Sequence, residues 1–168
     1  MEKTAANKTT FTASKAFILL LLLSLTTLAP LAQNQFVTGP LVNAMLYITV
    51  VLLGIRSAVL LSFLPSLVAL GVGILAPSLA PMVPFIMASN IVMVLLFNLL
   101  KTNFTFGVFI SAAIKFVVLT SAAIILQNFI DNETLASKLL TLFTWPQLIT
   151  ALAGGLIAFV FLKMIKKV

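Results

Sequence analysis

The stretch GVFISAAIKFVVLTSAA, from Gly107 to Ala123, is apolar and rich in small residues, but a single lysine, Lys115, stands in its middle. Apart from that charge it has the composition of a membrane-spanning helix. The whole chain is similarly apolar, because 62% of its 168 residues are hydrophobic and only 8% are charged. Soluble domains average roughly 45–50% apolar and about 25% charged residues. The composition therefore predicts an integral membrane protein.

Long apolar runs divide the chain into candidate membrane spans of about 20 residues. The runs cover residues 16–32, 37–54, 57–75, 82–100, 104–130 and 145–162. Prolines, glycines or short polar segments interrupt the chain between them. We therefore expect an all-α fold, with one six-helix transmembrane bundle over residues 16–163, a tail over residues 1–15 and a basic tail over residues 164–168.

The basic residues predict how this bundle is oriented. With both termini in the cytoplasm, the inner segments hold eight of the ten basic residues and the outer loops hold Lys138. The eight are Lys3, Lys8, Lys15, Arg56, Lys101, Lys163, Lys166 and Lys167. The positive-inside rule thus favours a multi-pass protein of the inner (plasma) membrane with both termini cytoplasmic. In the alternative, residues 1–29 are a cleaved signal peptide and five spans remain.

Several classes of function are excluded by what the sequence lacks. Without cysteine or histidine there are no thiolate or imidazole ligands for metals, haem or iron–sulfur clusters, and no Cys/His nucleophile. There is no phosphate-binding loop motif and no pair of carboxylates within a span that could couple transport to ions. We therefore expect no enzyme, no cofactor, no metal and no nucleic-acid partner. The net charge of +7 comes from basic residues at the ends of the membrane spans and does not indicate binding to nucleic acid.

Lys115 is the residue that most needs an explanation. It lies eleven residues beyond Phe104, or roughly 16 Å along a helix in a hydrocarbon core about 30 Å thick. A lysine at that depth costs about 2.5–3.5 kcal/mol on insertion scales and usually faces the bundle interior. No carboxylate lies within a span to pair with it. In a purely structural role, Lys115 bonds to backbone carbonyls or to water, or stays uncharged. In a functional role, it binds the carboxylate or phosphate of a ligand.

Other polar residues lie on helical stripes in three further spans. Asn43 and Tyr47 are one turn apart in the second span, Asn90 lies near the middle of the fourth, and Gln147 begins the sixth. Such residues commonly join membrane helices to one another. Alternatively, Asn43, Tyr47, Asn90, Lys115 and Gln147 converge on one outward-facing pocket.

Two outer connections border this predicted pocket. Residues 131–143 carry an interfacial apolar pattern, so they are expected to lie flat at the membrane surface, either as a linker or as a lid. The segment from Gly71 to Phe85 contains Pro77, Pro81 and Pro84. These prolines predict an ordered, non-helical connection, which is either a rigid hairpin or a wall of the pocket.

Two segments carry a resemblance to a known family. LAPMVPFIMASN at residues 79–90 and TWPQLITALAGGLIAFVFLK at residues 144–163, with six short spans, resemble small bacterial membrane proteins grouped with the S components of energy-coupling factor (ECF) transporters. Some of these proteins carry the name iron hydrogenase, although this chain lacks the ligands for such chemistry. The resemblance covers about residues 11–165. The first helix departs from the family's docking pattern of alanines at every fourth position.

The resemblance implies a substrate-capture subunit for a vitamin or micronutrient. Such a subunit docks on a transmembrane scaffold protein driven by two ATPase subunits, within the lipid bilayer. It makes Asn90, Lys115 and Gln147 candidates for the pocket, with Trp145 at its rim. We therefore expect uptake of a small anionic ligand from outside. The alternative is a scaffold, assembly factor or holin-like pore whose polar stripes only pack helices.

Overall fold

The computed structural model describes the backbone of residues 2–75 and 77–168 and the side chains from residue 13 onward within those ranges. All regular structure in these residues is helical, which confirms the predicted all-α class. The elements are α1 (Glu2–Leu28), η1 (Ala29–Ala32), α2 (Gln35–Leu52), α3 (Ile55–Gly71), η2 (Pro77–Met82), α4 (Val83–Leu100), α5 (Phe104–Gln127), α6 (Glu133–Phe143) and α7 (Trp145–Met164), where η marks a 3-10 helix.

Helix starts in the polar connections have a common cause. Asn34, Asn103 and Asn132 each precede a helix, and the side-chain oxygen of each accepts a hydrogen bond from a backbone N–H in the first turn of α2, α5 or α6. Asparagine is among the best residues for this capping. The same polar residues that interrupt the apolar runs therefore also fix where the next helix begins.

Five apolar segments are long enough to cross a membrane: Ala13–Ala32, Gln35–Leu52, Pro77–Leu100, Phe104–Gln127 and Glu133–Met164. These helices indicate a multi-pass membrane protein. The remaining apolar helix, α3, has 17 residues and is shorter than those spans, so the sixth crossing stays a prediction. The backbone is helical from Glu2, so much of the expected tail at residues 1–15 continues the first span.

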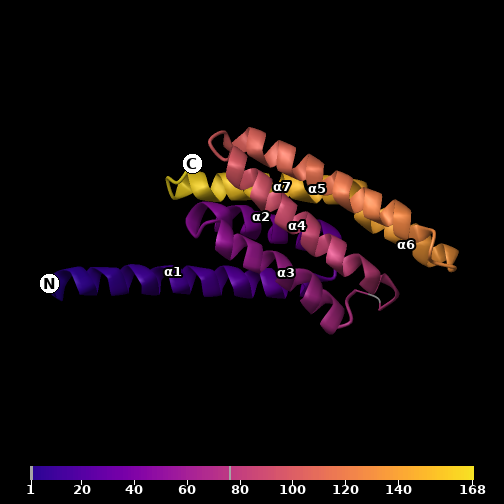
Figure 1. Cartoon of the computed structure of the whole chain (residues 1–168), viewed down its shortest axis with the longest axis horizontal. Helices are drawn as coiled ribbons and strands as arrows, with labels where there is room; N and C mark the ends of the chain where they lie inside the picture. Colours follow the sequence, from indigo (N-terminus) through magenta and orange to yellow (C-terminus); the bar gives the residue numbers. More distant parts are fainter. Residues whose placement is uncertain (1, 76) are drawn as a thin grey trace.

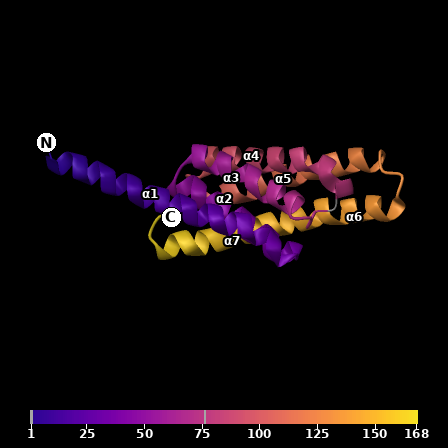
Figure 2. The ribbon, with the colours of Figure 1, turned by 90° about the horizontal axis from the view of Figure 1, so that it is seen from below.

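The helices run up and down along one long axis (Figures 1 and 2). Both termini, the α2–α3 turn and the α4–α5 turn lie at one end of the bundle, which we call the basic end because Arg56, Lys101 and Lys163 lie there. The opposite end, the distal end, carries η1, η2 and the α5–α6 turn. The N-terminal part of α1 extends past the other helices.

Two hydrophobic clusters divide the interior. The larger cluster contains residues from helices α1, α2, α3, α4, α5 and α7, and it includes Leu46, Phe97 and Leu162, all fully buried. The smaller lies at the distal end, where Leu139 and Phe143 of α6 pack on Leu79, Met82 and the far half of α5. The distal elements thus have a core of their own.

The structure corrects both predictions about the outer connections. The segment at residues 131–143 was expected to lie flat, but α6 continues nearly in line with α7 in both views and is anchored by Leu139 and Phe143. The flat prediction was wrong because these two apolar residues face α5 instead of the membrane surface. The proline-rich connection is not entirely non-helical, since Pro77–Met82 forms a 3-10 helix.

Candidate functional site

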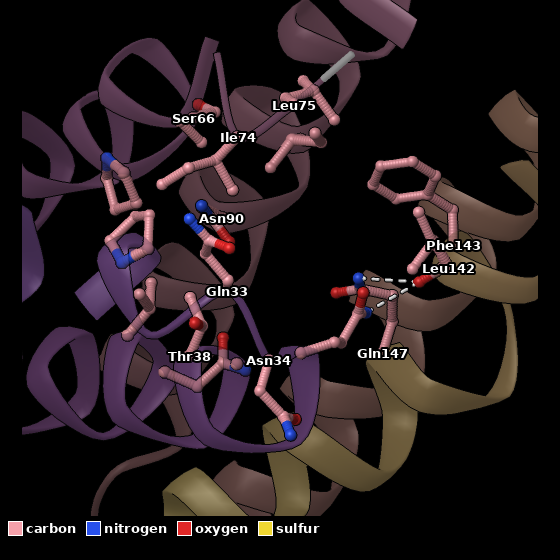
Figure 3. Close-up of a pocket in the computed structure, with 18 of the residues that line it drawn as sticks. Gln33, Asn34, Thr38, Ser66, Ile74, Leu75, Asn90, Leu142, Phe143 and Gln147 are labelled. Carbon is pink, nitrogen blue, oxygen red and sulfur yellow. Dashed lines mark hydrogen bonds between the residues drawn. The ribbon is translucent and has the colours of Figure 1, made fainter. Parts of the chain in front are cut away.

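A cavity of about 330 Å³ lies at the distal end, within the size range of small-molecule sites. Figure 3 shows it between the start of α2 on one side and α6 with the start of α7 on the other. Its lining comes from every helix except α1 and η2. The lining residues are Pro30, Gln33, Asn34, Gln35, Thr38, Gly39, Val42, Asn43, Pro65, Ser66, Ala69, Ile74, Leu75, Ile86, Asn90, Lys115, Lys138, Leu142, Phe143 and Gln147.

Lys115 lies at the inner end of this cavity. Its side chain is only 3% exposed, which confirms the prediction that it points into the bundle. Its Nζ donates a hydrogen bond of 2.6 Å to Oδ1 of Asn43 on α2. This partner was not predicted, because only carboxylates, backbone carbonyls, water and a ligand were considered for Lys115. An amide oxygen provides the partner that no carboxylate supplies, but a neutral oxygen does not compensate the charge of a protonated lysine.

Close packing of α2 on α7 holds Asn43 in position. A Cβ placed on Gly154 would lie 2.6 Å from Cβ of Asn43 and 2.8 Å from the carbonyl oxygen of Pro40. Real Cβ atoms do not come so close, so only glycine allows α7 to approach α2 here. Likewise, a Cβ placed on Gly39 of α2 would lie 2.7 Å from Cβ of Thr150 on α7. The small residues on the second and last spans are thus used for packing.

Tyr47 lies one turn below Asn43 on α2 and does not line the cavity. It is fully buried, its hydroxyl is 3.1 Å from Oγ of Ser111, and its ring packs edge-on against Phe97 with centroids 4.7 Å apart. The structure therefore separates Tyr47 from Asn43, although the sequence put both on one helical face.

Asn90 lines the cavity from α4 and is 2% exposed. Its Nδ2 donates to the backbone carbonyl of Ser62 on α3 at 3.4 Å. A carbonyl can only accept, so this contact fixes which end of the amide is nitrogen. The Oδ1 atom is buried and has no hydrogen-bond partner among the described residues. Buried polar atoms without partners are rare, and each needs an explanation.

Gln147 lines the cavity from the first turn of α7, and Figure 3 shows it beside the end of α6. Its Nε2 donates to the backbone carbonyl of Leu142 at 3.0 Å. Gln35, at the start of α2, donates from its Nε2 to the same carbonyl at 2.8 Å. The two amides thus join α2 and α7 to the last turn of α6, where carbonyls lack helical partners.

Trp145 does not line the cavity. Its side chain is 65% exposed, and its ring packs against Phe116 of α5 with centroids 5.1 Å apart. It lies at the distal end of α7, where an amphipathic ring suits a membrane–water interface. Of the six candidate residues, the cavity thus gathers Asn43, Asn90, Lys115 and Gln147.

Sequence reasoning missed several polar residues of the rim. Gln33, Asn34 and Lys138 are exposed, while Gln35, Thr38 and Ser66 line the walls. The run from Gln33 to Gln35 is one of the short polar segments that interrupt the apolar runs, and no binding role was predicted for it. Its signal was the concentration of amides in one outer connection, since one polar residue is enough to cap a helix.

The cavity has a strongly one-sided charge. Lys115 lies at the inner end and Lys138 at the rim, and the described lining includes no aspartate or glutamate. Six amide side chains also line it: Gln33, Asn34, Gln35, Asn43, Asn90 and Gln147. Two ammonium groups among neutral amides attract an anion, especially where burial weakens screening. Among the described residues, no group of acidic side chains capable of holding a metal ion is found.

No protein-family model, curated protein or solved structure matches this chain.

Proposed function

We propose that this protein is a membrane substrate-binding subunit that captures a small anionic nutrient from outside the cell. In this proposal all six apolar helices cross the membrane and both termini are cytoplasmic. The basic end of the bundle then faces the cytoplasm, in accord with the positive-inside rule. The cavity, at the distal end, then faces outward.

The observation that carries the proposal is the environment of Lys115. Its buried Nζ is bonded to the neutral Oδ1 of Asn43, in a cavity whose other charged lining residue is Lys138. A protonated lysine at this depth needs a counter-ion, because an uncompensated buried charge is costly. A ligand carboxylate or phosphate would compensate it, and a 330 Å³ cavity has room for one.

Binding alone does not move a nutrient across a membrane. The chain has no phosphate-binding loop and no paired carboxylates within a span, so we propose that a partner supplies the energy. The resemblance to ECF S components gives that partner a form: a transmembrane scaffold with two ATPase subunits. The protein itself then acts as the capture subunit and not as an enzyme.

A second candidate function rests on the close packing of α2, α5 and α7. A Cβ on Gly155 would overlap Cγ1 of Val108, as one on Gly154 would meet Asn43. Such glycine contacts serve any tight helical assembly. A scaffold, assembly factor or holin-like pore would need this packing, but it would have no need of a cavity with a buried lysine.

The test compares anions retained by the purified full-length protein. Wild type, Asn43→Asp and Tyr47→Phe are purified in mild detergent, and released small molecules are identified by mass spectrometry. Asn43→Asp places a carboxylate where the amide now contacts Lys115, so we expect the retained anion to be lost while the fold is kept. Tyr47→Phe, one turn away and outside the cavity, should retain it. Equal retention by Asn43→Asp would contradict an anion site at Lys115.

The partner is tested separately by co-expression with a tagged ECF scaffold and its two ATPases. Co-purification is the expected result, and its failure would remove the ECF part of the proposal. Dye leakage from liposomes containing the pure protein would favour a holin-like pore instead.

A further inference from the structure

The amides around the cavity are oriented in a consistent way. Asn90, Gln35 and Gln147 each use their nitrogen on a backbone carbonyl, that of Ser62 for Asn90 and that of Leu142 for both glutamines. Because a carbonyl cannot donate, the side-chain oxygens of these three residues are the ends left over. Each oxygen is an acceptor that makes no hydrogen bond to the described residues.

The opposite arrangement holds at the inner end. There Asn43 uses its oxygen to accept from Lys115, which leaves the Asn43 nitrogen as a donor. The ammonium of Lys115 has three N–H groups and no acceptor, and one of them is directed at Asn43. The inner end of the cavity therefore offers donors, whereas Asn90, Gln35 and Gln147 add acceptor oxygens elsewhere on a lining whose rim also holds Lys138.

From this pattern, and resting on the proposed function, we propose that the ligand is a small organic acid that also carries N–H or O–H donors. Its acid group binds Lys115 and the amide nitrogen of Asn43. Its donors point at the oxygens of Asn90, Gln35 and Gln147. A hydroxy acid or an amino acid has this chemistry, whereas sulfate and a purely aliphatic acid have no donor, and phosphate is too small to reach from Lys115 to the oxygens of both glutamines.

Asn90 is the strongest part of this argument. Its Oδ1 is buried without a partner in the described part of the chain, and the residue lines the same cavity as Lys115. A buried acceptor left unpaired costs free energy, which a ligand donor would recover. An acid without such a donor would fill the cavity and keep Asn90 unpaired. This difference is the basis of specificity for donor-bearing acids.

The spacing also limits the ligand's length. Gln35 and Asn43 are eight residues apart on α2, which corresponds to about 12 Å along the helix. Gln147 lies level with Gln35, because both contact the carbonyl of Leu142. The acid group and the farthest donor are therefore separated by no more than about 12 Å.

The experiment measures thermal stabilisation of the detergent-solubilised full-length protein by matched acids. Malate, gluconate and glutamate are each compared with the acid that lacks the hydroxyls or the amine: succinate, hexanoate and glutarate. Phosphate and sulfate are included as inorganic anions. Every compound is tested on wild type and on Lys115→Met. We expect Lys115-dependent stabilisation by donor-bearing acids, with affinities at least about tenfold above those of their partners.

Variants of the acceptor identify the residue responsible. Asn90→Leu should reduce the affinity ratio within a pair toward one while stabilisation still depends on Lys115. Ser89→Ala is the matched control, because Ser89 is buried beside Asn90 on α4 but bonds only to its own helix at Ile86 and does not line the cavity. If Asn90→Leu does not fold, Gln147→Met serves in its place and should also lower the ratio.

The outcomes separate this inference from the proposed function. Equal Lys115-dependent binding of both members of each pair, or binding of phosphate or sulfate alone, would overturn the donor requirement and leave an anion-binding subunit. If none of the compounds stabilises wild type more than Lys115→Met, both the inference and the proposed function fail. An undiminished ratio in Asn90→Leu would assign the specificity to other residues and overturn the role of Asn90.

Discussion

The Nζ of Lys115 and the Oδ1 of Asn43 are 2.6 Å apart, and the contact joins the middle of α5 to α2 at the inner end of the cavity. One turn nearer the basic end, Tyr47 and Ser111 form a second contact between the same helices, at 3.1 Å. The two contacts are four residues apart on each helix, from Asn43 to Tyr47 on α2 and from Ser111 to Lys115 on α5. The first lines the cavity and involves an ionisable amine, whereas the second lies in the core and joins two hydroxyl groups. They therefore form a natural pair for comparison.

The charged contact should be the stronger of the two. In a double-mutant cycle of Asn43→Ala and Lys115→Met, we expect a coupling free energy of about 1.5–3 kcal/mol, the range for hydrogen bonds to charged groups. The matched cycle of Tyr47→Phe and Ser111→Ala should give about 0.5–1.5 kcal/mol. The measurement is reversible unfolding in detergent. Equal couplings, or a larger one for Tyr47 and Ser111, would mean that Lys115 is not a buried cation.

Tyr47→Phe should lower stability without weakening anion retention. The substitution removes the hydroxyl, but Ser111 still donates to the carbonyl of Val108 at 3.1 Å. The free energy of unfolding should therefore fall by no more than about 1 kcal/mol. Retained anions, measured by mass spectrometry, should match those of wild type. A loss of the anion would return Tyr47 to the binding site.

Most of the fold follows from the apolar runs, and the candidate site follows from them only in part. Periodicity puts Asn43 and Tyr47 on one face of α2, but a four-residue step moves a side chain about 6 Å along the axis. That step separates the cavity from the sealed core. Which polar residue meets Lys115 depends on the position of α2 along α5. Helix α7 sets this register, because Gly154 packs on Asn43 of α2 and Gly155 packs on Val108 of α5.

The rim residues illustrate a second limit of the sequence. Lys138 belongs to α6, which was expected to lie flat, so its place at the cavity depends on α6 continuing in line with α7. Trp145 shows the converse, because its helix position is as expected while its ring turns outward onto Phe116. Residues near chain turns take their direction from tertiary packing, and hydrophobic periodicity does not describe that packing.

Membrane orientation can be measured cleanly because the chain contains no cysteine. Thr102→Cys places a thiol in the exposed α4–α5 turn at the basic end, and Thr134→Cys places one in exposed α6 at the distal end. With both termini cytoplasmic, a membrane-impermeant maleimide should label Thr134→Cys in intact cells. It should label Thr102→Cys only after permeabilisation. The reverse pattern would put the cavity on the cytoplasmic side and contradict capture from outside.

Gly154 should be the most sensitive glycine for binding. The new methyl group of Gly154→Ala would meet Asn43 and Pro40, at 2.6 and 2.8 Å, and must push α2 and α7 apart. Overpacking of this kind costs about 1–3 kcal/mol. Because the displaced backbone carries Asn43, the variant should also lose the anion that wild type retains.

The matched control for Gly154→Ala is Gly71→Ala, at the end of α3. A Cβ on Gly71 meets nothing within 4 Å, so its stability and anion retention should stay at the wild-type values. Both variants are compared by thermal unfolding and by mass spectrometry of released anions. If Gly154→Ala were destabilised but kept the anion, Asn43 would not need its present position. The role of α7 would then be to pack the bundle without shaping the site.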